Sequence, residues 1–226
     1  FDVFSHAIES LTARPFSQRP APDNSNLRPL GQGANPYSDL ACEESIRLIG
    51  ANLIAAVNDD DNSATLEPLM FASMLAGIGF GNAGCHLPHA MSYAVAGLVR
   101  GYTAPGWPSN HPMVPHGISV IVNAPAVFRF TGPACPERHL KAAEAMGADV
   151  SGVAIEDAGD VLADRVIAMM RETGIPNGNS GVGYEESDLE PLTERAFIQK
   201  RLLDNSSLVP DQDQLKELFR DSLSYW

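Results

Sequence analysis

The chain has 226 residues, of which 44% are hydrophobic and 19% are charged, so it is long enough to bury a substantial core. Fifteen Lys and Arg residues against 28 Asp and Glu residues give a net charge of −13, which argues against binding to phosphate backbones or anionic lipid surfaces. The three cysteines form no CxxC pair, which argues against a disulfide framework and a thiolate zinc site. We therefore expect an acidic, soluble globular protein from a reducing compartment.

The N-terminal part of the chain alternates between helical and irregular patterns. Apolar residues at helical spacing predict a helix over residues 2–13. Five prolines then fall within residues 15–37 and predict a long irregular excursion, which in a compact domain is usually functional or a family-specific insertion. After it, we expect Ser38 to cap a second helix that continues to the acidic residues at 59–61.

No charged residue occurs between Pro68 and Val99. A segment of this length also fits a membrane span, but polar residues and glycines interrupt it, so we interpret it as two core helices of a soluble protein. Within it, Gly79, Gly81 and Gly84 have the G-x-G-x-x-G spacing of dinucleotide-binding loops. No strand pattern precedes these glycines and no acidic residue follows them by about twenty positions, so close helix packing is the favoured explanation.

The C-terminal part of the chain also follows a helical pattern. After a loop at 101–114, Pro115 suits the first turn of a helix, although the β-branched residues of HGISVIVNAPAVFRF also fit a strand. Further helices are predicted at 137–146, 161–172 and 212–224, and the capping-box spacing of Ser187 and Glu190 predicts another near Asp188. Roughly seven to nine helices and no convincing strand result, so we predict an all-α fold.

Histidines carry the main chemical signal, because four of the six lie in or beside the least charged part of the chain. Asp2 and His6 are four residues apart on the first predicted helix, so they share one face. His86 and His89 are three residues apart, and His116 follows a proline in VPHG. One carboxylate with two or three imidazoles suits a divalent first-row metal such as Fe(II), Zn(II) or Co(II).

Each of these residues also has a purely structural explanation. Asp2 is a candidate cap for the first helix, and His6 is a candidate core histidine bonded to a carbonyl. Cys85 lies next to His86 and is a further candidate ligand, although a buried cysteine is more often a small apolar side chain. We expect His111 and His139 to face solvent, outside any metal site.

Three segments resemble the C-terminal helical domain of iron-containing (group III) alcohol dehydrogenases, which have the dehydroquinate synthase-like fold. These segments are DVFSHAIES, GIGFGNAGCHLPHAMSYAVAGLV and HPMVPHGISVIVNAPAVF. The GFGNAG and MSY motifs and the proline-rich excursion resemble the hydroxyacid-oxoacid transhydrogenase branch of this family. Because the similarity runs through essentially the whole chain, residues 1–226 are expected to be one helical metal-binding domain.

The resemblance also implies a set of metal ligands, in the family pattern D-x-x-x-H, H-A-M and P-H-G. Carried over residue by residue, the ligands are Asp2, His6, His89 and His116. His89 and His116 would form part of the catalytic centre, and His86 would be a neighbour of it. Fe(II) is the implied metal and Zn(II) the alternative. Many family members have a histidine four residues after H-A-M, but this chain has Tyr93 there, so a proton relay is not carried over.

The activity implied by the resemblance is hydride transfer between a hydroxyl group and a nicotinamide cofactor, NAD or NADP. The transhydrogenase branch implies 4-hydroxybutyrate and 2-oxoglutarate as substrates, with succinate semialdehyde and 2-hydroxyglutarate as products. Such carboxylates need a cationic clamp, for which Arg100 and Arg129 are candidates. The alternative is a non-catalytic helical interaction domain whose core histidines are structurally satisfied.

Family members carry an N-terminal α/β domain with a glycine-rich phosphate loop, and this chain lacks the strand-glycine-helix pattern of such a domain. We therefore expect the dinucleotide-binding domain to be missing and the chain to be inactive alone. The expected partner is a small hydroxyacid or alcohol, with no nucleic acid and no membrane, and the intact enzyme is expected to be a homodimer. The expected location is the cytoplasm, or the mitochondrial matrix in an animal.

Overall fold

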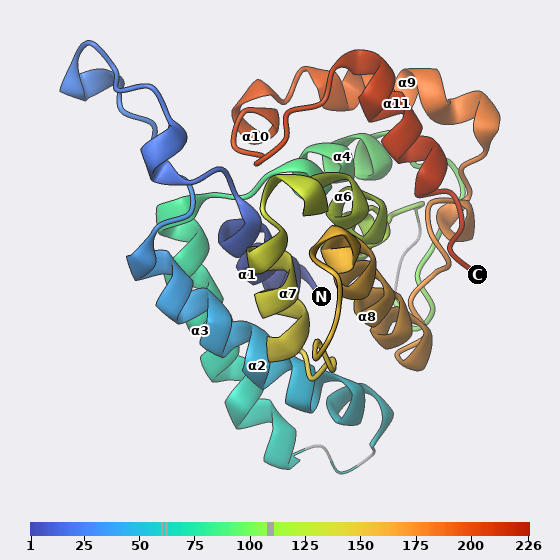
Figure 1. Ribbon diagram of the computed structural model, residues 1–226. Helices are drawn as coiled ribbons and strands as arrows, with labels where there is room; N and C mark the ends of the chain where they lie inside the picture. Colours follow the sequence, from blue (N-terminus) through green and yellow to red (C-terminus); the bar gives the residue numbers. More distant parts are fainter. Residues whose placement is uncertain (60, 62, 108–110) are drawn as a thin grey trace.

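The computed structural model describes residues 1–59, 61, 63–107 and 111–226, and the ordered elements of these residues are helices and short 3-10 turns (Figure 1). Extended pairing among the described residues is limited to isolated bridges, so the all-α prediction is confirmed. Residues 108–110 of the expected loop, and Asp60 and Asn62 after the second helix, lie outside the described residues.

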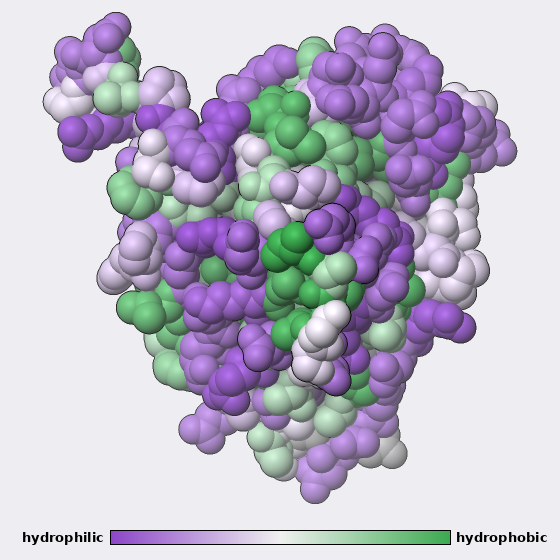
Figure 2. Space-filling view, in the orientation of Figure 1, coloured by the Kyte–Doolittle hydropathy of each residue, from purple (hydrophilic) through white to green (hydrophobic). Residues whose placement is uncertain are grey.

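The helices surround the one nearest the N-terminus. In chain order they are α1 (Asp2–Thr12), α2 (Pro36–Asn58), α3 (Ser63–Ala83), α4 (Leu87–Gly97), α5 (His116–Ile121), α6 (Ala124–Thr131), α7 (Pro136–Ala145), α8 (Ala158–Glu172), α9 (Leu189–Phe197), α10 (Lys200–Leu203) and α11 (Gln212–Asp221). Helix α1 lies inside the bundle against α2, α3, α5 and α7 (Figure 1). Helices α2 and α3 pack together on one side, and α9 packs against both α4 and α11 on the other. The face shown in Figure 2 is largely hydrophilic, with small apolar patches near its centre.

The central position of α1 follows from its apolar stripe. Phe4, Ile8 and Leu11 recur at helical spacing and are at most 1% exposed. Because neighbouring helices surround α1, its polar residues Glu9 and Ser10 are also fully buried. Buried polar groups are costly unless they are hydrogen-bonded, so the partners of these side chains must come from the protein itself.

Two predicted helix caps differ from the observed ones. Asn35 caps α2, and Ser38 occupies the third helical position, where its hydroxyl completes a capping box with Asn35. The helix near Asp188 is confirmed as α9, but the capping box precedes it: Glu185 and Asp188 form this box at the 3-10 turn Glu186–Asp188, and Ser187 donates instead to the Glu185 carboxylate. In both places the prediction chose a later residue than the one that caps.

The segment at 116–131 is helical, so the strand alternative is wrong. It forms the short helices α5 and α6, which are separated at Val122 and Asn123. Pro115 is the N-cap of α5 rather than its first helical residue. The β-branched residues that suggested a strand, including Val120 and Ile121, are buried in the helical core.

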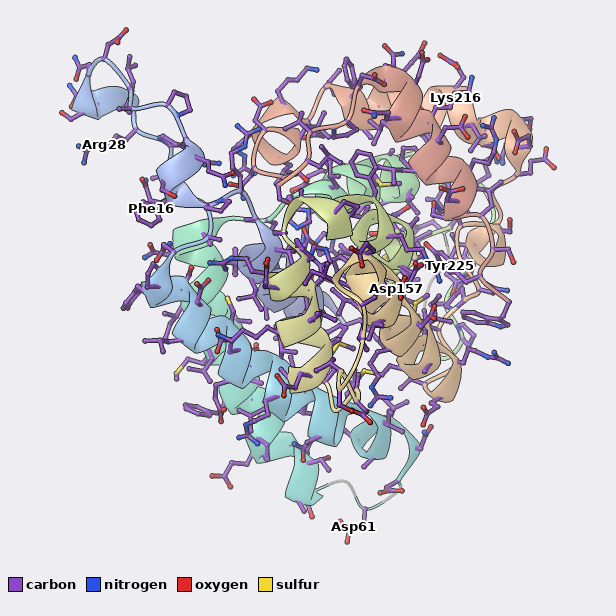
Figure 3. All side chains as sticks on the ribbon, in the orientation of Figure 1. Phe16, Arg28, Asp61, Asp157, Lys216 and Tyr225 are labelled. Carbon is purple, nitrogen blue, oxygen red and sulfur yellow. The ribbon has the colours of Figure 1, made fainter. Side chains whose placement is uncertain are left out.

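The proline-rich excursion is an irregular arm that projects from the body of the protein (Figure 1). The side chains of Phe16 and Arg28 point into solvent along this arm (Figure 3). Near its base, Arg19 donates a hydrogen bond to the side-chain oxygen of Asn205. Asn205 in turn donates to the carbonyl oxygen of Cys85 at 2.9 Å. The arm is therefore connected to the turn between α3 and α4.

Helix α3 is not the core helix that the uncharged segment predicted. Its buried residues are small and face α1 and α2: Ala72, Ala76, Gly79 and Ala83. Five of its larger apolar residues are exposed: Leu66, Met70, Phe71, Met74 and Ile78. By length and composition alone this helix is able to cross a membrane, but a single helix of this kind is weak evidence for a membrane span. The absence of charged residues from this segment therefore did not mean that helix α3 is buried on all of its faces.

The three spaced glycines have different roles. A Cβ added at Gly79 would lie 2.3 Å from the Cys42 sulfur, so the predicted close helix packing is confirmed at this position. A Cβ at Gly81 would meet nothing within 4 Å. Gly84 follows the end of α3 with a φ of +82°, a left-handed conformation that glycine adopts without steric cost.

His139 is fully buried, so its expected position in solvent is wrong. Its Nδ1 lies 2.9 Å from the carbonyl oxygen of Cys135, and its Nε2 lies 2.9 Å from the Thr131 hydroxyl. Burial lowers the pKa of His139 to about 4, despite the favourable hydrogen bond to Cys135. The ring is therefore neutral in the folded protein at neutral pH.

This buried ring makes the free energy of unfolding depend on pH. The pKa of His139 is lower in the folded protein than in the unfolded chain, where histidine titrates near 6.5. Between these values only the unfolded chain takes up the proton, so the stability present above pH 6.5 is lost as the pH falls. We expect His139 to account for a loss of about 3 kcal/mol between pH 7 and pH 4.

Denaturant unfolding of the protein and of His139→Gln at several pH values measures this contribution. The variant should lose less stability than the parent over the same pH range. Equal pH dependence in the two proteins would contradict the assignment of a buried, neutral ring.

Candidate metal centre

The four residues that the family pattern assigns converge around the Asp2 carboxylate. Asp2 Oδ1 lies 3.4 Å from His89 Nε2 and 3.4 Å from His116 Nε2, and Asp2 Oδ2 lies 3.8 Å from His6 Nδ1. The centroids of the His6 and His89 rings are 4.6 Å apart, and those of His89 and His116 are 5.4 Å apart. The structure therefore brings three separate segments of the sequence to one cluster.

Each segment reaches the cluster through local geometry. Asp2 and His6 project from the first two turns of α1, as their spacing predicts. His89 lies in the first turn of α4, and His116 begins α5. A Cβ on Gly117 would lie 3.1 Å from the Asp2 backbone nitrogen, so the glycine of the P-H-G motif permits the close approach of α5 to α1.

Two neighbours shape the cluster without being part of the family pattern. Phe80 stacks on His6 with a centroid distance of 4.1 Å and an interplanar angle of 21°. The buried Cys85 thiol lies close enough to the nitrogens of His6 and His89 to form a second possible ligand group. The other possible ligand group consists of the Asp2 carboxylate and the nitrogens of His89 and His116. His89 belongs to both groups and is the centre of the cluster.

His86 is a neighbour of the cluster, as the family pattern implies. Its Nε2 lies 3.0 Å from the Thr12 hydroxyl, and the ring is fully buried. Burial lowers the pKa of His86 to about 4, although the Glu9 carboxylate opposes this shift. A neutral His86 is thus held against α1, and its backbone positions the chain just before His89.

Glu9 is the important residue that the sequence analysis missed. This fully buried carboxylate lies 2.6 Å from His89 Nδ1 and accepts a hydrogen bond of 2.7 Å from the backbone amide of His86. A signal was present in the sequence, because Asp2, His6 and Glu9 are spaced i, i+4 and i+7 on one helix face. A carboxylate that is buried with its helix requires a partner.

The buried charges act on one another. Burial lowers the pKa of His89, but the carboxylates of Glu9 and Asp2 and the nearby Cys85 outweigh it, so the pKa lies far above its usual value. Burial raises the pKa of Glu9 and of Asp2, but the neighbouring histidines reverse the shift and both carboxyl groups remain ionised at neutral pH. Burial is the main cause of a lowered pKa at His6. The cluster therefore presents two carboxylates to a group of imidazoles.

The donor set fits a divalent metal ion. Asp2 Oδ1 and His89 Nε2 are buried polar atoms without a hydrogen-bond partner, and they face one another at 3.4 Å. Buried polar atoms are normally paired, and a cation bound by both atoms would satisfy them. Imidazole and carboxylate ligands suit Fe(II) and Zn(II). The His116 side chain is 50% exposed, so the cluster is accessible from that side.

The two predicted arginine clamps have partners within the chain. Arg100 lies 2.5 Å from the Asp188 carboxylate. Arg129 pairs with Asp160 and Asp164 at 2.9 Å and 2.7 Å. Both guanidinium groups therefore neutralise carboxylates of this chain, and their role as a substrate clamp stays a prediction.

Comparison with known proteins gives a consistent result. The model of the Fe-containing alcohol dehydrogenase family, C-terminal, matches residues 30–223. The mitochondrial hydroxyacid-oxoacid transhydrogenases of Xenopus laevis and Homo sapiens are 41% and 40% identical to the chain over 227 residues. Each alignment covers 100% of this chain and 49% of the relative, so the chain spans about half the length of these relatives.

A solved structure of 1,3-propanediol oxidoreductase is similar to the fold, with a TM-score of 0.79 and 27% sequence identity. The match covers 98% of this chain and 50% of that protein. The similarity in sequence and fold extends across the helices that carry the clustered residues. The chain belongs to the Fe-containing alcohol dehydrogenase family and matches its C-terminal domain.

Proposed function

We propose that this chain is the metal-binding half of a hydroxyacid-oxoacid transhydrogenase. The observation that carries the proposal is the convergence of Asp2 with three histidines around two buried atoms that lack hydrogen bonds. The similarity to transhydrogenases along the full chain supports the same activity. Under this proposal, a dinucleotide-binding domain in the other half of the enzyme holds NAD or NADP.

The proposed ligands of the metal are Asp2, His6, His89 and His116, with Fe(II) as the metal and Zn(II) as the alternative. When bound, such a metal acts as a Lewis acid that lowers the pKa of a substrate hydroxyl group. The residues around it keep the ligands in place: Phe80 packs on His6, and Gly117 lets α5 approach α1. The exposed edge of His116 provides the side from which a small substrate enters.

The proposed substrates are 4-hydroxybutyrate and 2-oxoglutarate, which exchange a hydride through the nicotinamide cofactor. One substrate is oxidised to succinate semialdehyde, and the other is reduced to 2-hydroxyglutarate, so the cofactor is not consumed. The mitochondrial names of the relatives support a mitochondrial location for the intact enzyme. A homodimer of the intact enzyme is part of the same proposal.

Metal binding tests the proposal directly. After anaerobic reconstitution with Fe(II), and separately with Zn(II), we expect about one ion per chain by elemental analysis. His89→Ala and His116→Ala each remove a proposed ligand. Loss of a residue that only supports a ligand weakens metal binding by up to about 100-fold, so loss of a ligand itself should weaken binding by more than this. His111→Ala changes an exposed histidine outside the cluster and serves as the control.

Two results would contradict this assignment. One is a folded parent protein that takes up no stoichiometric metal. The other is a His116→Ala variant that binds the ion as tightly as the parent does. Either result would favour the alternative, in which the histidines belong to a non-catalytic helical domain.

Substrate conversion tests the activity. The chain joined to the dinucleotide-binding half of a curated relative should form 2-hydroxyglutarate from 2-oxoglutarate only when 4-hydroxybutyrate and metal are present. His116→Ala in the same fusion should lower the rate by at least about 100-fold, because a ligand of the metal is missing. Formation of 2-hydroxyglutarate without 4-hydroxybutyrate, with added NADH or NADPH as the hydride donor, at the rate of the complete reaction would contradict the transhydrogenase assignment and leave a simpler oxidoreductase.

A further inference from the structure

Glu9 is a buried carboxylate with two partners at the start of α4. One oxygen lies 2.6 Å from His89 Nδ1, and the other accepts a hydrogen bond of 2.7 Å from the His86 amide. The side chain is fully buried, so water does not replace either interaction. Glu9 therefore connects α1 to both the start of α4 and the ring at the centre of the cluster.

This contact keeps a proton on Nδ1 of His89. An ionised carboxylate only accepts hydrogen bonds, so His89 Nδ1 must be the donor in the contact with Glu9. Nε2, which faces Asp2 Oδ1 at 3.4 Å, is then the nitrogen that gives up its proton and offers a lone pair when a metal ion binds. Histidine ligands in proteins commonly donate their second N–H to a carboxylate, which fixes the ring and strengthens its donor nitrogen.

The charge of Glu9 also matches the proposed ion. Asp2 is the one carboxylate among the proposed ligands and supplies one negative charge. Glu9 supplies a second charge behind His89, so the two carboxylates together balance a divalent cation. This balance reduces the cost of placing an ion in a largely buried site.

We propose that Glu9 is a positioning residue of the metal centre: it holds His89 in the tautomer that ligates the ion and completes the charge balance of the site. This inference depends on the proposed metal-binding function, and it assigns a role to a residue outside the family's ligand pattern. Glu9 acts through His89 and does not itself touch substrate or metal.

Glu9→Gln tests this role because the two side chains have the same shape. A glutamine amide offers one oxygen, so it satisfies either His89 Nδ1–H or the His86 amide, but not both. It also removes the negative charge. We expect Co(II) binding, followed by its visible absorption bands, to weaken by about 10- to 100-fold, with a changed spectrum.

Glu9→Asp and Ser45→Ala are the matched comparisons. The aspartate keeps the charge but has a shorter reach, so its Co(II) affinity should fall between those of the parent and Glu9→Gln. Ser45→Ala removes a buried hydroxyl that donates to the carbonyl oxygen of Ala72 at 2.8 Å, between α2 and α3 and outside the cluster, and should leave Co(II) affinity and spectrum unchanged. The free energy of unfolding without metal is measured for every variant, so that a folding defect is separated from a binding defect.

A folded Glu9→Gln variant with the affinity and spectrum of the parent would overturn the role of Glu9. Equal weakening in Ser45→Ala would also overturn it, because the effect would then reflect general loosening of the core. If Glu9→Gln does not fold, Glu9→Asp decides: parent-like binding with an unchanged spectrum contradicts the proposal, and weaker binding with a changed spectrum supports it. A parent protein that binds no Co(II) contradicts the metal centre itself, which is a separate outcome.

Discussion

The buried contact between the Glu9 carboxylate and the His89 ring is the interaction on which the centre depends. Both groups are almost completely removed from water, where an isolated charge is very costly. Each group is tolerated because the other is present, and the His86 amide satisfies the second carboxylate oxygen. The start of α4 is thereby fixed relative to α1, and His89 faces Asp2. The other members of the cluster are arranged around this pair.

The residue pattern of helix α1 determines both the packing of the core and the position of the cluster. Its apolar residues, among them Phe4 and Ile8, place the helix in the middle of the bundle. Its polar residues Asp2, His6 and Glu9 recur at i, i+4 and i+7 and therefore face the same neighbours. Burial of α1 in the core means that each of its polar groups needs a partner within the protein. The packing of this helix therefore also brings the cluster together. The surrounding helices α3, α4 and α5 then supply Phe80, His89 and His116.

Much of the fold could be predicted from the sequence, because helical periodicity and proline positions are local signals. The first helix, the irregular arm and the later helices follow these signals closely. The cap of α2 was misplaced because Ser38 takes part in the capping box from inside the helix, which depends on the backbone path at Asn35. The expected exposure of His139 was wrong because tertiary packing decides burial. A local signal was present, because His139 shares a helix face with the apolar Ala142, which is also buried.

The candidate site was less accessible to sequence reasoning than the fold. Spacing showed that Asp2 and His6 share a face, but only the family resemblance joined them to His89 and His116, because contacts between distant segments leave no local signal. The same limit applies to Arg100 and Arg129, whose acidic partners lie 31 to 88 residues away in the sequence. The residue that was missed, Glu9, had a local signal in the helix but a partner 80 residues away.

The arrangement also relates the site to the stability of the fold. The clustered side chains come from α1, α4 and α5, and the α5 helix has only six residues. Short helices gain their stability from packing rather than from their own hydrogen bonds. An ion held jointly by Asp2, His89 and His116 would connect the three helices, and a ligand that binds only the folded state stabilises it. Under the proposed function, the half-exposed His116 would both border the entry of substrate and attach α5 to the ion, so a substitution that opened the site there would also remove a contact between α5 and its neighbours.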